Sequence, residues 1–316
     1  MWWMPMVSFL DEASFIQLFV KEMEIPASLR VDLDSRLVED LDFDSLQMML
    51  TVELLAELLG EPELFGEELD LLEALDTVRG VYSYYLTRSS MPPAEDEVGE
   101  IGGSVGPVPR RGLRGALVEL KPPLGQHYGK LYEIATATEV AWRWRYGGAI
   151  PSYDEFIRTF EAGVLTQLVA TRLGHDEPVG LVAVYNANPM NKHAYLAAVV
   201  EPCLVGSGAG AEAVALFCGY VFDVWDFEKL YLELPEYNLK QFASGLDRYL
   251  KLEGRLGGHS WYGGRRWDQL ILAIYRDDFV CWQGAPAGER SKAHVVILDK
   301  DATSQPATVV PSGERF

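Results

Sequence analysis

A serine at the start of a helix is the first residue of this sequence that is placed for chemistry. Asp44-Ser45-Leu46 precedes an apolar pattern of helical spacing, so Ser45 falls at the N-cap or in the first turn. We expect its side chain to be exposed at the positive end of the helix dipole, which favours a covalently attached phosphodiester. The plain alternative is that Asp44 or Ser45 only caps the helix.

A glycine-rich turn lies far downstream, within residues 199–213. The pattern there is a strand, then Gly206-Ser207-Gly208-Ala209-Gly210, then a helix. Glycines allow backbone N–H groups to approach a phosphate at a helix N-terminus. Taken alone, the turn equally fits a dinucleotide fingerprint or a simple tight turn. Its position after several strands argues against the dinucleotide site, which opens the first strand–helix unit.

The serine is positioned by a predicted four-helix bundle at the front of the chain. Apolar spacing predicts helices over residues 8–24, 45–59, 64–69 and 77–86. We assign residues 1–88 to this all-α domain and residues 89–112, rich in Pro, Gly and Ser, to a flexible linker. A coil of about 25 residues has a root-mean-square reach of about 25–30 Å. Such a tether holds the bundle at roughly millimolar effective concentration around a neighbouring active site.

The glycine turn is positioned by a second predicted domain, residues 113–282, in which strands and helices alternate. The expected helices cover 128–146, 153–162, 210–224 and 239–250. The expected strands cover 117–120, 165–172, 178–186, 193–200, 229–234, 252–261 and 267–275. Interleaved elements of these lengths predict an α/β or α+β fold with a mixed sheet. Residues 283–316 are expected to form a largely disordered tail.

The charge of the chain is uneven and excludes some partners. The formal net charge is −20, and residues 1–90 hold nineteen Asp/Glu against five Lys/Arg, which argues against nucleic-acid binding. No apolar run reaches the ~18 residues that a membrane helix needs, and no basic signal region precedes one. We therefore expect a cytoplasmic protein that is not membrane-bound. Three unpaired cysteines (Cys203, Cys218 and Cys281) predict neither a zinc site nor disulfides.

The serine and its surroundings resemble the modification site of acyl carrier proteins. The similar pattern is Leu41-Asp42-Phe43-Asp44-Ser45-Leu46, and the resemblance covers roughly residues 8–88. It implies that Ser45 carries a covalent 4'-phosphopantetheine, installed by a phosphopantetheinyl transferase. It also implies an acidic surface that docks on partner enzymes, including trans-acting enzymes of an assembly line.

The second domain resembles the GNAT acetyltransferase superfamily, in the branch that includes ribosomal-protein N-acetyltransferases. The resemblance spans residues 114–279 and rests on the glycine turn and on Asn238 after the next strand. It implies acetyl-CoA or another acyl-CoA, whose pyrophosphate would be held by Val205, Gly206, Ser207, Gly208, Ala209, Gly210 and Ala211. The chain departs from the family at Val205 (usually Arg or Gln), Gln241 (usually Ser) and Tyr249 (usually Gly). These departures put in doubt how tightly the acyl-CoA donor binds, and they do not affect the expected fold.

A reaction of this family, amine attack on a thioester, needs a base, a donor to the carbonyl oxygen and an acid for the thiolate. Glu233, five residues before Asn238, matches a position that some members use as the base. Its alternative is a charged residue on the solvent face of a strand. The usual acid position is Gly245 here, so Tyr249 or Tyr237 is a substitute on chemical grounds only. The expected catalytic residues are Glu233, Asn238 and Tyr249.

The segment Trp142-Arg143-Trp144-Arg145 is a candidate for recognition of the acceptor. Its tryptophans could line an acceptor or pantetheine channel, and its arginines could receive the acidic bundle. Core packing and a solvated basic face are the alternatives.

Together these observations predict a carrier–acyltransferase didomain. It would move an acyl group between a thioester, on CoA or on phosphopantetheine, and an amine borne by a small molecule or a carrier-bound substrate, in natural-product biosynthesis. One alternative is a loading enzyme that S-acylates its own carrier, for which Glu233→Gln would leave activity largely intact. The other is a non-catalytic adaptor that binds no acetyl-CoA.

Overall fold

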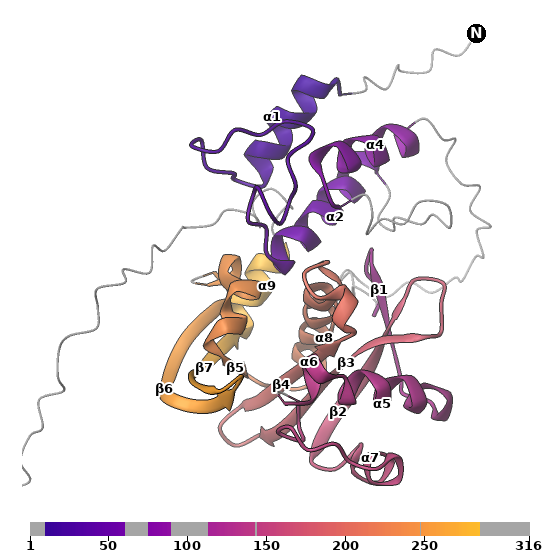
Figure 1. Cartoon of the computed structure of the whole chain (residues 1–316), viewed down its shortest axis with the longest axis vertical. Helices are drawn as coiled ribbons and strands as arrows, with labels where there is room; N and C mark the ends of the chain where they lie inside the picture. Colours follow the sequence, from indigo (N-terminus) through magenta and orange to yellow (C-terminus); the bar gives the residue numbers. More distant parts are fainter. Residues whose placement is uncertain (1–9, 61–74, 90–112, 143, 247, 285–316) are drawn as a thin grey trace, which may run out of the picture.

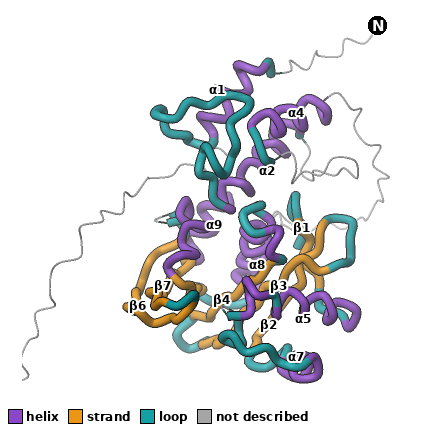
Figure 2. Tube along the Cα trace, in the orientation of Figure 1, coloured by secondary structure: helices purple, strands orange, loops and turns teal. Residues whose placement is uncertain are grey.

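A small helical region lies against a larger domain built on one sheet (Figure 1). The structure, a computed structural model, describes residues 10–60, 75–89 and 113–284, apart from 143 and 247. We call residues 10–60 and 75–89 the helical region and residues 113–284 the sheet domain. Figure 2 shows the helices of the first above the strands of the second.

The described helices of the helical region are α1 (Glu12–Glu22), α2 (Ser45–Leu59) and α4 (Val78–Ser89). They agree with three of the predicted helices, and the fourth, predicted over 64–69, lies outside the described residues. Their apolar faces meet in a core whose largest buried side chains are Phe15, Phe19, Leu37, Leu50 and Tyr84.

A capping box fixes the start of α2. The Asp44 carboxylate accepts hydrogen bonds from the backbone N–H groups of Leu46 and Gln47, at 3.0 and 2.9 Å. The Gln47 side chain accepts one from the Asp44 N–H at 3.2 Å. Both partners satisfy donors that a helix start leaves unpaired, so Ser45 is the first helical residue.

The sheet domain contains a seven-stranded mixed sheet in the order β1-β2-β3-β4-β5-β7-β6. The strands are β1 (Val118–Lys121), β2 (Val164–Arg172), β3 (Pro178–Asn188), β4 (His193–Val200), β5 (Lys229–Pro235), β6 (Leu250–Tyr262) and β7 (Arg265–Tyr275). This confirms the predicted mixed sheet. Neighbouring strands are antiparallel except β4 and β5, which are parallel.

The parallel pair separates along its length. Strands β4 and β5 are paired only at His193–Lys229, Ala194–Leu230 and Tyr195–Tyr231, although each strand continues further. Beyond this point the facing backbone edges of the two strands do not pair with each other. A gap therefore opens in the middle of the sheet.

Helices cover both faces of the sheet. They are α5 (Tyr128–Thr136), α6 (Thr138–Ala141), α7 (Tyr153–Thr159), α8 (Ala209–Val224) and α9 (Arg276–Gly284), with short 3-10 segments η1 (Gly125–His127), η2 (Pro202–Leu204) and η3 (Glu236–Gly245). Along β3, Val182 and Val184 pack in the core shared with α8, whereas Leu181 packs in a separate cluster with α5. Alternation along a strand buried on both faces explains this division.

Two predicted helices differ from the structure. The helix predicted over 128–146 is broken at Ala137 into α5 and α6, and residues 144–150 form turns and loop. The helix predicted over 239–250 is instead the 3-10 segment η3, which ends at Gly245, and β6 begins at Leu250. Packing on α2 and β7 fixes η3, so tertiary contacts override the local helical pattern.

The helical region packs on the sheet domain through the N-terminal half of α2. The Asp44 carboxylate accepts hydrogen bonds from the Ser244 N–H (2.8 Å) and hydroxyl (2.9 Å). Asp42 pairs with Lys240 at 2.5 Å on the surface. At Gly208 the backbones approach so closely that an alanine Cβ would lie 2.8 Å from the Met49 nitrogen. The two parts therefore form one packed body around α2, α8 and η3.

None of the described helices is long and apolar enough to span a membrane. No group of His, Cys, Asp and Glu in residues 10–60, 75–89 and 113–284 is arranged to hold a metal ion. The three cysteines are free thiols.

Candidate active site

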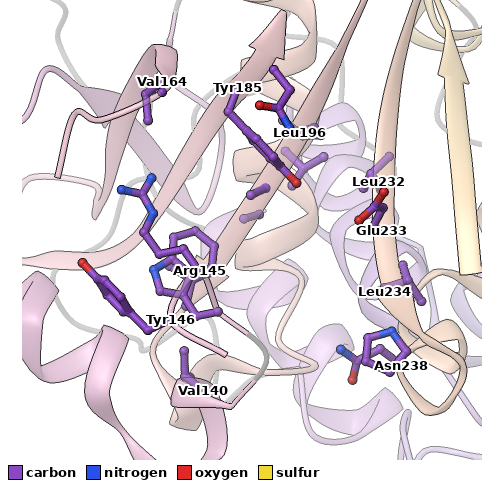
Figure 3. A pocket seen from close by; sticks show the side chains of 18 of the residues that line it. Val140, Arg145, Tyr146, Val164, Tyr185, Leu196, Leu232, Glu233, Leu234 and Asn238 are labelled. Atoms are coloured by element: carbon purple, nitrogen blue, oxygen red, sulfur yellow. The ribbon is translucent and has the colours of Figure 1, made fainter. Parts of the chain in front are cut away.

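The gap between β4 and β5 is the site of the main pocket, with a volume of about 650 Å³. Its walls include Leu196–Val199 of β4 and Leu232–Pro235 of β5, which are the parts of these strands that do not pair with each other. Figure 3 shows side chains from β3, β5 and the segment after α6 converging on this space. Strand backbones with unpaired N–H and C=O groups form strong hydrogen bonds with an extended ligand.

Glu233 and Tyr185 face this pocket from different strands. In Figure 3 the Tyr185 hydroxyl points toward the strand that carries Glu233. Burial raises the pKa of Tyr185 above its ordinary value, and the negative charge of Glu233 raises it further. Glu233 itself is exposed. The site therefore offers a solvent-reachable carboxylate as a proton acceptor and a phenol that keeps its proton.

Asn238 and Gln241 line the same pocket from η3. Both are half-buried, and Figure 3 shows the Asn238 amide at the end of the loop that follows β5. The structure thus brings two of the three predicted catalytic residues, Glu233 and Asn238, to one cavity.

The third predicted catalytic residue, Tyr249, lies elsewhere. It is 9% exposed and packs against Trp282, at 4.5 Å between ring centroids, and against Phe279. Burial raises the pKa of its hydroxyl. Tyr237, the other tyrosine considered, packs against Trp142 in a tilted contact and against Trp267 edge to face, and it does not line the pocket.

The aromatic and basic segment after α6 forms one wall of the pocket. Trp144, Arg145 and Tyr146 line it, and the Arg145 guanidinium donates to the Phe160 carbonyl at 2.8 Å. Trp142 stacks on Tyr262, at 3.6 Å between centroids, and is not among the lining residues. Arg143 lies outside the described residues. Of the two roles considered for Arg145, contact with the acidic bundle is not the one seen: Asp42 and Asp44 contact Lys240 and Ser244 instead.

The glycine turn forms the predicted strand–turn–helix unit. Gly206 and Gly208 have positive φ angles of 89° and 87°, and α8 begins at Ala209. The Ser207 hydroxyl accepts from the Ala209 N–H at 3.3 Å and donates to the Leu204 carbonyl at 2.8 Å. Val205 lies in the turn, and Gly210 and Ala211 lie in the first turn of α8. Instead of facing open solvent, Gly208 is buried against α2.

Ser45 begins α2 as predicted, but its expected exposure is wrong: the residue is only 7% exposed. The cause is the packing of α2 on the sheet domain. On one side of Ser45 in the sequence, Asp44 is hydrogen-bonded to Ser244, and on the other side Leu46 lines a cavity of the sheet domain. Among the residues that the structure describes, none forms a hydrogen bond with the Ser45 hydroxyl.

A second, small cavity of about 20 Å³ lies between Leu46 and the main pocket. Val214, Leu232 and Phe242 line both spaces. These three side chains are therefore the wall between the main pocket and the residue that follows Ser45.

Sequence reasoning missed Tyr185. Its only signal is its place at the end of the apolar run of β3, directly before the polar Asn186. Nothing local in the sequence shows that this end of the strand faces Glu233.

Comparison with known proteins identifies no relative by sequence: no protein-family model and no curated protein matches the chain. The solved structures that resemble it include spermidine N-acetyltransferase of Vibrio cholerae in complex with CoA and spermine (16% identity, TM-score 0.47, 52% of this chain and 99% of that one). Others are a GNAT-family acetyltransferase of Bacillus anthracis (13%, 0.44, 52% and 98%) and a probable GNAT-family acetyltransferase of Chromobacterium violaceum (18%, 0.44, 60% and 100%). At these identities and TM-scores the likeness carries no information on reaction, substrate or partner.

Proposed function

We propose that the chain is an N-acyltransferase of the GNAT type, joined to an acyl carrier region, that moves an acyl group from a thioester to an amine. The observation that carries this proposal is the pocket in the β4–β5 gap, with the Glu233 carboxylate and the Tyr185 phenol facing it. We place the reaction in natural-product biosynthesis, with a small amine or a carrier-bound amine as acceptor.

The shape of the pocket suits a long thioester donor. Pantetheine is an extended chain with two amide groups, and the unpaired edges of β4 and β5 offer backbone donors and acceptors along such a chain. The volume of about 650 Å³ leaves space for an acyl group and an acceptor in addition.

The residues of the pocket divide the proton transfers between them. Glu233, exposed and facing the cavity, accepts the proton that the attacking amine loses. Tyr185, whose pKa is raised, stays protonated and donates to the departing thiolate. Asn238 is placed to hold the acceptor or the acyl oxygen by its amide.

Ser45 is the proposed attachment site of 4'-phosphopantetheine. The residues fit this group: the hydroxyl lies at a helix N-terminus and has no hydrogen-bond partner among the described residues, and Leu46 beside it lines a small cavity that shares Val214, Leu232 and Phe242 with the main pocket. When attached, the arm supplies the thiol that carries the acyl group as a thioester.

The test begins with the full-length chain, a phosphopantetheinyl transferase and acetyl-CoA, followed by removal of free CoA. Intact mass spectrometry should show an acetylated arm that is missing in Ser45→Ala. Ethanolamine, putrescine and tyramine are then added, and loss of the acetyl mass is followed. We expect Glu233→Gln to slow the transfer by about 10²–10⁴-fold. The matched control is Glu228→Gln, since this carboxylate, paired with Lys192, is highly exposed and does not line the main pocket.

Other outcomes would identify the alternatives. Transfer to the amine that Glu233→Gln leaves intact would remove Glu233 as the base. An arm thiol that gains acyl groups from acetyl-CoA in the absence of the transferase would indicate a loading enzyme. A chain that acylates none of the amines, from the arm or from acetyl-CoA, would contradict the proposed function.

A further inference from the structure

We infer that the acyl donor of this enzyme is its own carrier, docked in cis through α2, and that free acyl-CoA does not use the glycine turn in this arrangement. The inference rests on the proposed function and names the donor of that reaction.

The glycine turn is covered by the helical region. Gly208, at the N-terminus of α8, is buried, and the Met48–Met49 backbone of α2 lies so close that no Cβ fits between them. A CoA pyrophosphate bound at this N-terminus would have to occupy the same space. Val205, where an Arg or Gln is expected for pyrophosphate binding, is 39% exposed and offers no donor side chain. The residues therefore do not fit CoA while α2 is docked.

The same docking brings the residue that follows Ser45 close to the pocket. Leu46 lines the small cavity, and Val214, Leu232 and Phe242 line both that cavity and the main pocket. Phe242 belongs to η3, the segment whose Ser244 and Lys240 hold Asp44 and Asp42. The segment η3 thus holds the helical region in place and also supplies Phe242, a side chain that an arm from Ser45 would have to pass.

Two helix N-termini meet at this place, which favours a phosphodiester on Ser45. Helix α2 begins at Ser45 and α8 begins at Ala209, and Gly208 at the start of α8 lies against the Met48–Met49 backbone, one turn into α2. Their positive ends repel each other and both attract an anion. Asp44 supplies one negative charge there, and a phosphodiester on Ser45 would add another.

The side from which the arm would enter the pocket makes it the donor of the acyl group rather than the acceptor. The arm reaches the pocket from the glycine-turn side, where a CoA donor would otherwise lie, so both cannot be bound there together. Glu233 is exposed, so an acceptor can reach it from solvent. The amine nitrogen bonds to the acyl carbon, the carbon–sulfur bond breaks, the amine proton passes to Glu233, and the thiolate takes a proton from Tyr185. The products are an amide and a free arm thiol.

The first test asks where the arm thiol lies and needs no acceptor. It uses the full-length chain with Cys203→Ser and Cys281→Ser, which remove the exposed cysteines, and an unacylated arm on Ser45. Alkylation of the arm by N-ethylmaleimide is followed by intact mass. We expect Val214→Phe and Phe242→Trp, which fill the passage from two elements, each to accelerate alkylation by about tenfold or more. Val224→Phe, at an exposed position of the same helix α8 (53%), should leave the rate unchanged.

Equal alkylation rates in the parent chain and in both passage variants would overturn the inference. Circular dichroism of each variant identifies one that fails to fold, and the two passage variants act from α8 and η3 separately.

The second test separates transfer in cis from transfer in trans. An acetyl-loaded Glu233→Gln chain supplies carrier without base, and a Ser45→Ala chain supplies base without carrier. We expect the intact chain to transfer at a rate independent of protein concentration, and the mixed pair to be slower and proportional to concentration. A pair as fast as the intact chain, or turnover of free acetyl-CoA by Ser45→Ala, would refute the cis donor and leave the proposed function standing. Protection of the thiol without transfer in any arrangement would refute the proposed function instead.

Discussion

Gly208 gives the most direct test of how the helical region is held. In Gly208→Ala the new Cβ would lie 2.8 Å from the Met49 nitrogen and 3.2 Å from the Met48 carbonyl carbon. Atoms of the α2 backbone cannot rotate away as a side chain can, so the helix itself must retreat. Gly206→Ala is the matched control, because its φ of 89° is almost the same as the 87° of Gly208 and nothing lies within 4 Å of its Cβ position.

The magnitude follows from the difference between the two variants. A left-handed backbone costs alanine about 1–2 kcal/mol at either position, and this term cancels. What remains is the overpacking against α2, about 1–3 kcal/mol. Converted at about 1.4 kcal/mol per factor of ten, this lowers the docked-to-undocked ratio roughly 5–150-fold in Gly208→Ala alone.

Hydrogen exchange measured by mass spectrometry, on peptides covering the first turns of α2, reports this ratio directly. We expect faster exchange there in Gly208→Ala than in Gly206→Ala, with α4 peptides unchanged between the two. Equal exchange of the α2 peptides in both variants would refute the reasoning, because it would mean that α2 does not rest on the N-terminus of α8.

Three further outcomes are expected. Burial raises the pKa of Asp44, and the hydrogen bonds from Ser244 lower it, so Ser244→Ala should raise this pKa further in a carboxyl NMR titration. The docked form, with the raised pKa, binds the proton more tightly than the undocked form. Docking should therefore weaken as the pH rises just above the ordinary pKa of 3.8. Glu212, buried beneath three backbone N–H donors, has its pKa raised to about 7 from 4.5, so the free energy of unfolding should fall by about 3 kcal/mol from pH 4.5 to 7, and Glu212→Gln should remove this slope in urea titrations. Tyr185→Phe should slow single-turnover transfer by about tenfold, less than loss of the base, since a thiolate leaves without full protonation, and an unchanged rate would exclude the phenol as the acid.

The regular elements were predictable because their signals are local. The Asp44–Gln47 capping box marks the start of α2, and the apolar runs of β2 to β5 mark buried strands. The 3-10 segment η3 was mistaken for an α-helix, since its sequence has helical spacing and only its contacts with α2 and β7 hold it otherwise.

The site was only half predictable. Glu233 lies in β5 and Asn238 follows that strand three residues after its end, so a short pattern identifies them. Tyr185 belongs to the same pocket because β3, β4 and β5 are neighbours in the sheet, and no local pattern encodes that. Gly208 is required for a second reason that the sequence does not show. Because it has no Cβ, the backbone of α2 can lie against it, although α2 is more than 150 residues away in the sequence.

The hydrogen bonds between Asp44 and Ser244 have a kinetic consequence. With the proposed cis donor, the carrier stays bound to its own catalytic domain, so raising the concentration of thioester in solution would not saturate the enzyme. Each polypeptide would complete one cycle and then stop until its arm is recharged. Recharging would require α2 to separate from η3, so the strength of the Asp44–Ser244 contact would set how long a spent enzyme waits.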